Sequence, residues 1–359
     1  MSETVHPVLA RAMALMEVNR RDQAQELLVR HVAQEPDDAF AWERLAACRN
    51  SAEDFTGAME AANEALRLDP YRGDAHLRRS DSFRFRGLVY DAADAAREAR
   101  RLLPQAAAPR VALAKALRMM PDEAGLEEAY DVALEGISLD PELLGAHSTL
   151  YYIARDMDRP DIAEQALHTV LRLEPTDAWA RAELARMKDE ANEAKLPQLA
   201  KEYSEALGAD PDADHIEGRL HGVVYRLLRR TRWFALLCLL IATLDARVFP
   251  TGDDPTGLPA PWPTRMWGLV LMAVVWAVGA WRIYRKLPRG ARMSTRLLLR
   301  RFFWARLAVG QALWGMLFAV VALTAPWTDR GVLRTLVLVG AVPLVLTIWF
   351  ERAAMRSAD

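Results

Sequence analysis

The chain has 359 residues, of which 52% are apolar and 26% are charged, and its formal net charge is only −2. These totals alone would fit a soluble protein of two or three domains. The charge is divided, however: residues 1–218 hold 26 basic and 42 acidic side chains, a net charge of −16, whereas residues 219–359 hold 20 and 6, a net charge of +14. Nine of the 11 tryptophans also lie in the second part. This division excludes a single soluble domain with a well-mixed surface.

Prolines recur through the acidic part at a nearly constant spacing. Each one closes a run of apolar residues with helical periodicity, because proline lacks an amide donor and biases the preceding residue away from the helix. The prolines are Pro36, Pro70, Pro104, Pro141, Pro175 and Pro211, which are 34, 34, 37, 34 and 36 residues apart. A fixed period of this length predicts a repeat architecture.

Small side chains follow the same period. A small residue stands twelve positions before five of the six prolines, and a second position, seven residues further on, is small in four of the six units. Small residues at both points let two antiparallel helices approach closely. The first set is Ala24, Ala58, Ala92, Ala129 and Ala163, with Leu199 in the last unit; the second is His31, Ala65, Ala99, Gly136, Val170 and Ala206.

This pattern resembles the tetratricopeptide repeat (TPR) family, whose unit of about 34 residues is a pair of helices. The second unit carries it best, with Trp42, Leu45, Ala46, Ala58, Ala65 and Pro70 at the signature positions. The likeness covers residues 5–212, about six units, although the signature tryptophan occurs only at Trp42 and the signature glycine is replaced in every unit. The resemblance implies an all-α solenoid in which the first helix of each pair lines a concave face.

The resemblance also implies which residues face the concave groove, and basic side chains collect there although the domain is acidic. The candidate partner-binding residues are Arg84, Lys115, Arg118, Tyr152, Arg155 and Arg186. Because guanidinium groups bind carboxylates bidentately, this wall is expected to select an acidic or C-terminal carboxylate peptide of a protein partner. The alternative is that these are the solvated cations common on any exposed helix.

In the basic part, residues 219–359, the sequence pattern changes to continuous apolar runs. These runs predict a transmembrane domain of four helices. The expected segments are a linker with an amphipathic basic helix at 213–232, a transmembrane domain at 233–350 with spans at about 230–249, 265–284, 307–327 and 333–350, and a tail at 351–359. A span needs about 20 residues, so only the third run suffices without extension. The first is the weakest, because Asp245 and Arg247 lie inside it. The rival interpretation is a set of core helices in a soluble domain.

Flanking charges predict the orientation of these spans. The segment from Arg282 to Arg306 and the tail are basic, whereas residues 250–264 contain Asp253 and Asp254 and no basic residue. The positive-inside rule then places the basic loop, the repeats and both termini in the cytoplasm of a cell whose inner (plasma) membrane the chain crosses several times. The basic loop is expected to meet anionic lipid headgroups rather than nucleic acid.

No residue pattern indicates a catalytic, metal or cofactor site. The seven histidines show no pair at the i, i+4 spacing of a helical metal site, and Cys48 and Cys238 stand alone. No glycine-rich phosphate loop is present, and no small-molecule substrate is evident. Gln311 is the only amide side chain within a predicted span, where it is either a functional polar group or a hydrogen-bonding contact between helices.

These features favour a non-enzymatic, membrane-anchored scaffold or adaptor that binds a cytosolic protein partner through the concave face of its repeats. The alternative is an accessory or regulatory subunit of a membrane transport, secretion or envelope-assembly complex, in which the four-span domain carries the main interaction. A membrane enzyme is disfavoured, because the predicted spans hold no cluster of acids, bases or metal ligands.

Overall fold

The computed structural model describes residues 6–121, 123–246, 260–286 and 303–356. All the regular secondary structure in these ranges is helical, so the expected all-α fold is confirmed. The chain divides into two compact units, residues 1–175 and 176–359, so the predicted repeats are distributed over both units. Each unit is described separately below.

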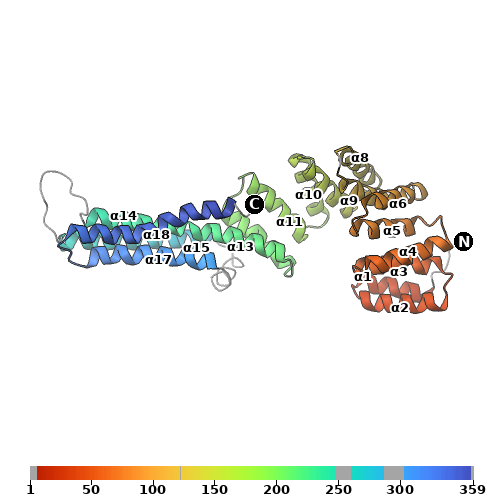
Figure 1. Cartoon of the computed structure of the whole chain (residues 1–359), viewed down its shortest axis with the longest axis horizontal. Helices are drawn as coiled ribbons and strands as arrows, with labels where there is room; N and C mark the ends of the chain where they lie inside the picture. Colours follow the sequence, from red (N-terminus) through yellow and green to blue (C-terminus); the bar gives the residue numbers. More distant parts are fainter. Residues whose placement is uncertain (1–5, 122, 247–259, 287–302, 357–359) are drawn as a thin grey trace. The chain divides into compact units, whose positions relative to one another are not determined.

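The first unit consists of helices that pack against their neighbours in chain order (Figure 1). Each predicted repeat is a pair of helices, and each of the periodic prolines follows two residues after the second helix of its pair. The helices are α1 (Pro7–Glu17), α2 (Arg21–Gln34), α3 (Ala39–Ser51), α4 (Phe55–Leu68), α5 (Gly73–Phe85), α6 (Val89–Leu102), α7 (Ala107–Arg118), α8 (Glu123–Leu139), α9 (Leu144–Asp156) and α10 (Pro160–Leu173).

The periodic small side chains lie at the helix contacts, as the sequence predicts. Ala24, Ala58, Ala92, Ala129 and Ala163 are all buried, and so are the second-set residues Ala65 and Ala99. His31 and Val170, the larger residues of the second set, are buried as well. The period in the sequence is therefore a period of close helix approach.

The turn within a pair also repeats. Asn19, Glu53, Gly87, Asp158 and Asn192 each have a positive φ, between 55° and 75°, and each lies in the turn between the two helices of a pair. Asparagine, aspartate and glycine tolerate this left-handed conformation better than other residues. Glu53 is the least suited of the five, and its presence there shows that tertiary packing imposes the turn.

The second unit begins with three helices that share one core. Leu199 and Tyr203 of α12 pack in one cluster with Ile216, Leu220 and Val224 of α13, so α13 covers the end of the helix pair before it. The helices of this unit are α11 (Ala178–Glu190), α12 (Leu196–Ala209), α13 (Asp214–Arg229), α14 (Thr231–Asp245), α15 (Trp262–Lys286), α17 (Phe303–Thr324) and α18 (Arg330–Arg356).

Helices α14, α15, α17 and α18 lie alongside one another as a bundle (Figure 1), and α14 contacts each of the other three. Its interior combines small residues with leucines, and the buried members include Ala235, Ala319, Leu239, Leu323 and Leu344. A Cβ atom added at Gly340 would lie 2.8 Å from the Cβ of Phe318, so α17 and α18 approach closely at this glycine.

Large apolar side chains cover the outside of this bundle. They project from all four helices, in contrast to the repeats, whose outer faces are mostly charged. Examples exposed by more than 40% are Trp233, Leu237, Leu240, Trp267, Val270, Val274, Leu313, Leu317, Leu338 and Val345. The bundle therefore presents many large apolar side chains on its outer surface.

By length and composition alone, one helix among the described residues is suited to cross a membrane: Arg306–Thr324, with a mean hydropathy of 1.9. The core helix of a soluble protein can meet the same criterion, so the predicted four-span domain is not supported by this measure. Helix α14 ends at Asp245, and the remainder of the first predicted span lies outside the described residues. Helices α15 and α18 are longer than predicted, with 25 and 27 residues, and α18 continues through Pro343.

The close helix contacts predict a size limit at the buried alanines. Ala58→Leu should lower the free energy of unfolding of the full-length protein by about 1–3 kcal/mol, because the added atoms force two closely packed helices apart. The measurement is denaturation followed by circular dichroism. Asn63→Leu, at an exposed position of the same helix α4, is the control and should change the stability by less than about 0.5 kcal/mol. Equal effects of the two variants would contradict the assignment of Ala58 to a helix contact.

Candidate functional site

The predicted partner-binding residues lie on the first helices of successive pairs. Arg84 is on α5, Lys115 and Arg118 are on α7, and Tyr152 and Arg155 are on α9, all in the first unit. The sixth residue, Arg186, is on α11 in the second unit. Only five of the six candidates can therefore be described as one site.

Arg118, Tyr152 and Arg155 form a compact cluster around an aspartate. The Arg118 Nη1 atom lies 2.6 Å from Asp156 Oδ2, and the Arg155 Nη2 atom lies 3.0 Å from Asp156 Oδ1. Both guanidinium groups lie 5.2 Å from the centroid of the Tyr152 ring, within the range of cation–π contacts. The prediction missed Asp156, which follows Arg155 directly in the sequence and links α7 to α9.

A second part of the site joins α5 and α7. The Arg84 Nη2 atom lies 3.6 Å from Asp81 Oδ1, and the Arg84 guanidinium stacks 4.0 Å from the Phe85 ring. Burial lowers the pKa of Lys115; the negative charge of Asp81 opposes this shift and the positive charge of Arg84 adds to it. The Lys115 ammonium group is thus held in a place that penalises its charge.

The chemistry of this surface suits a carboxylate ligand. Asp81 and Asp156 offset part of the charge of Arg84, Lys115, Arg118 and Arg155, which leaves an excess of positive charge. The ion pairs with Asp156 engage only some of the five N–H groups that each guanidinium carries. A half-buried cation whose pKa is lowered is a candidate for function, because partial burial disfavours its charge.

Arg186 and Gln311 have different surroundings from this cluster. Arg186 pairs with two carboxylates of its own helix, at 2.8 Å from Glu183 and 2.6 Å from Glu190, and Glu183 also pairs with Arg219 at 2.8 Å. Gln311 is buried inside the four-helix bundle. Neither residue belongs to the surface formed by α5, α7 and α9.

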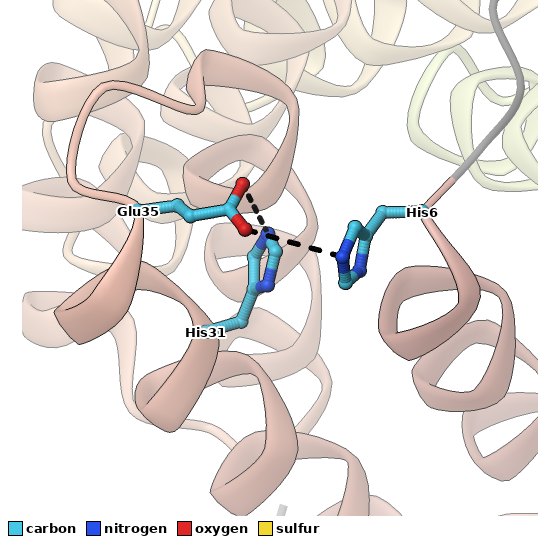
Figure 2. A group of neighbouring side chains, drawn as sticks. All are labelled: His6, His31 and Glu35. Atoms are coloured by element: carbon cyan, nitrogen blue, oxygen red, sulfur yellow. Dashed lines mark ion pairs between the residues drawn. The ribbon is translucent and has the colours of Figure 1, made fainter.

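A separate group of possible metal ligands lies near the start of the chain. Figure 2 shows the rings of His6 and His31 next to each other and near the Glu35 carboxylate, with Nε2 atoms 3.9 and 3.8 Å from its oxygens. The potential ligand atoms lie within 4.8 Å of one another, so the group could hold a metal ion. The two histidines are 25 residues apart in the sequence, and only the fold brings them together.

The hydrogen bonds of this group favour ion pairs over metal binding. The Nδ1 atom of His6 accepts a hydrogen bond from the Val8 amide, so the neutral ring carries its proton on Nε2, the atom that faces Glu35. His31 Nε2 lies 3.0 Å from Asp38 Oδ2. Burial would raise the pKa of Asp38, but hydrogen bonds from His31 and the Ala41 amide outweigh it and the pKa is lowered. This carboxylate therefore stabilises the fold at neutral pH, and its contribution is lost as the pH falls through the lowered pKa.

Comparisons with known proteins identify the fold. No protein-family model and no curated protein matches the chain. The structure is similar to the APC/C hetero-tetramer Cut9–Hcn1, with 17% identity, a TM-score of 0.53, and coverage of 60% of this chain and 42% of that one. It is also similar to a tetratricopeptide repeat protein from Parabacteroides merdae, with 13% identity, a TM-score of 0.50, and coverage of 61% and 85%.

A thermophilic TPR protein from Thermus thermophilus is a further similar structure, with 20% identity, a TM-score of 0.46, and coverage of 52% of this chain and 98% of that one. The TPR-like helical repeat fold expected from the sequence is thus confirmed. These matches cover about three fifths of the chain or less, and they do not confirm the fused membrane domain.

The burial of Lys115 makes a prediction about stability. Its folded-state pKa lies below the ordinary value of 10.5, so the unfolded chain binds more protons in the window between the two values. Stability should therefore rise as the pH increases through this window. Lys115→Met removes the buried charge and should raise the free energy of unfolding near neutral pH by on the order of 1 kcal/mol.

The measurement is denaturant unfolding of the full-length protein at several pH values. The control is Lys201→Met, at an exposed position, which should leave both the stability and its pH dependence nearly unchanged. If Lys115→Met instead lowers the free energy of unfolding, the charge of Lys115 does not destabilise the fold.

Proposed function

We propose that this protein is a membrane-anchored TPR-type scaffold that binds an acidic segment of a cytosolic protein partner and catalyses no reaction. The observation that carries the proposal is the cluster of Arg118, Tyr152 and Arg155, with the half-buried Lys115 on the same helix as Arg118. Two guanidinium groups that share one aromatic ring and one carboxylate are already oriented, so a ligand carboxylate pays little ordering entropy to bind them.

The distribution of side chains in the bundle supports the anchoring part of the proposal. Alanine and glycine stand at contacts between its helices, among them Ala235, Ala319 and Gly340, and let these helices pack closely where no hydrophobic effect drives them together. Its exterior carries large aliphatic and aromatic residues on all four helices, a surface that water solvates poorly and lipid chains solvate well. In this proposal α14, α15, α17 and α18 are the four spans.

Charge asymmetry supports the proposed orientation. Basic residues lie where α13 meets the bundle, among them Arg229 and Arg230 before α14 and Arg282 and Arg285 at the end of α15. Asp245 ends α14, at the opposite end of that helix. Under the positive-inside rule, the end near α13 faces the cytoplasm of a bacterial-type inner membrane, together with the repeats and both termini.

Charge reversal in the cluster should abolish partner capture. Arg118→Glu/Arg155→Glu places negative charge beside Asp156, so an acidic partner would be repelled and its recovery should fall at least about tenfold. The measurement is affinity purification of the tagged full-length protein from detergent-solubilised membranes, followed by mass spectrometry. Arg118→Ala/Arg155→Ala removes the same cations without adding charge and should also lower recovery.

The matched control is Arg67→Glu/Arg101→Glu, which makes the same charge change at exposed positions of the second helices α4 and α6. Its recovery of partners should equal that of the unmodified protein. If the cluster variants capture the same proteins while deletion of residues 219–359 abolishes capture, the accessory-subunit function is favoured, because the bundle then carries the interaction.

The proposed topology is tested with fusions in two segments outside the described residues. A reporter that is active only outside the cytoplasm should be active after fusion at Gly257 and silent after fusion at Gly290, because the first segment follows α14 and the second follows α15. The same fusions made with a reporter active only in the cytoplasm should give the opposite pattern. Activity of the first reporter at Gly290 alone would reverse the orientation.

A further inference from the structure

A hollow of about 1180 Å³ lies within the second unit, where the ends of α12 and α13 approach the ends of α14 and α15. Basic residues come to it from three directions. Lys195 and Lys201 lie at the beginning of α12, and Arg226, Arg229 and Arg230 lie at the end of α13. Arg282 and Arg285 come from the last turns of α15.

The charge of this wall is strongly one-sided. Among the described residues that line the hollow, seven are basic and Asp189 alone is acidic. Asp189 is bound by Arg226 through two contacts, one of 3.0 Å between Nη1 and Oδ1 and another between Nη2 and Oδ2. Cations brought this close repel one another, and an anion placed between them would relieve that repulsion.

The other side of the hollow is aromatic and apolar. Trp233 and Phe234 line it beside Gly279, where an added Cβ atom would lie 2.8 Å from Phe234 Cε2. The glycine thus lets the Phe234 ring lie directly against α15. Trp233 and Trp281 are 64% and 59% exposed, and the Arg285 guanidinium lies 5.1 Å from the centroid of the Trp281 ring. Tryptophans of this kind are typical of the level of the lipid headgroups.

We propose that this hollow binds an anionic phospholipid, with the phosphate headgroup on the basic wall and the adjoining acyl chains against Trp233 and Phe234. Arginine side chains bind phosphate oxygens bidentately, and basic pockets at the cytoplasmic side of membrane helices suit lipid headgroups. A free anion would use the basic wall alone, and an acidic peptide would leave the aromatic side unused. The proposal rests on the proposed function, because the headgroup reaches this hollow only from a surrounding membrane.

The headgroup would bridge elements on the two sides of the junction between α13 and α14 at Arg230. Lys195 and Lys201 belong to the last helix pair of the repeats, whereas Arg282 and Arg285 belong to the bundle. An anion bound by both groups would hold the end of the repeats against the membrane. Binding therefore ties the orientation of this end to the lipid composition.

The test measures lipid retention by the full-length protein in a non-ionic detergent, using native mass spectrometry with added phosphatidylglycerol or phosphatidylcholine. The unmodified protein should bind phosphatidylglycerol at least about tenfold more tightly than phosphatidylcholine. Arg282→Gln/Arg285→Gln should lower the apparent affinity for phosphatidylglycerol about 30-fold, since two basic contacts are lost. Lys201→Gln, on the opposite wall, should lower this affinity about fivefold. This variant provides the test if the double variant folds poorly.

Arg306→Gln is the matched control, because Arg306 is an exposed basic residue at the beginning of α17 that does not line the hollow. Its affinity should stay within about twofold of the unmodified protein. The proposal would be overturned if the protein bound the two lipids equally tightly. It would also be overturned if neither Arg282→Gln/Arg285→Gln nor Lys201→Gln changed the affinity for phosphatidylglycerol. Displacement of phosphatidylglycerol by millimolar inorganic phosphate would show a simple anion site, and displacement by a glutamate-rich peptide would show a peptide site.

Alkaline carbonate extraction of cell membranes separates this proposal from the proposed function. If the protein stays in the membrane but shows no preference for phosphatidylglycerol, only the lipid site is overturned. If carbonate releases the protein, the membrane anchoring fails and the lipid site fails with it.

Discussion

The close approach of helices at small side chains is the constraint on which both units of this protein depend. In the repeats, buried alanines such as Ala58 and Ala92 stand where paired helices touch. In the bundle, Ala235 and Cys238 of α14 and Gly340 of α18 do the same. A close-packed interior leaves no room for larger side chains at these points, so the spacing of small residues sets which helices pair and how near they come. The positions of the arginine cluster and of the basic hollow follow from that pairing.

The two units share this constraint, but the outer surface of the repeats is charged and that of the bundle is apolar. The repeats place their apolar residues between helices and carry charge outside, which accounts for the net charge of −16 in residues 1–218. The bundle instead exposes many large apolar side chains. Within the acidic repeats, the cations of α5, α7 and α9 are exceptions, and partial burial of one of them, Lys115, lowers its pKa. Such local departures from the overall pattern mark candidate binding surfaces.

The repeat fold could be predicted because its signals are local and recur. Proline ends a helix through its own backbone, and an alanine at a fixed period marks a contact in every unit, so each unit supports the assignment of the others. The candidate site was harder to predict, because it is formed by contacts between helices. Asp156 links Arg118 to Arg155 across two repeats, and Arg186 proved to lie in the other compact unit. His31 and Glu35 are four residues apart, but no spacing rule relates either of them to His6.

Composition and periodicity were sufficient to predict the helical class, the repeat period, the division of charge and the apolar character of the last third. These properties depend on single residues and on their spacing along one helix, which composition and periodicity record directly. Only the tertiary structure decided which charges neutralise one another, which of the apolar residues face outward, and that Lys195 and Arg282 line the same hollow. The reason is physical: an ion pair or a binding surface depends on distances between helices, and those distances arise from packing among residues that are far apart in the chain.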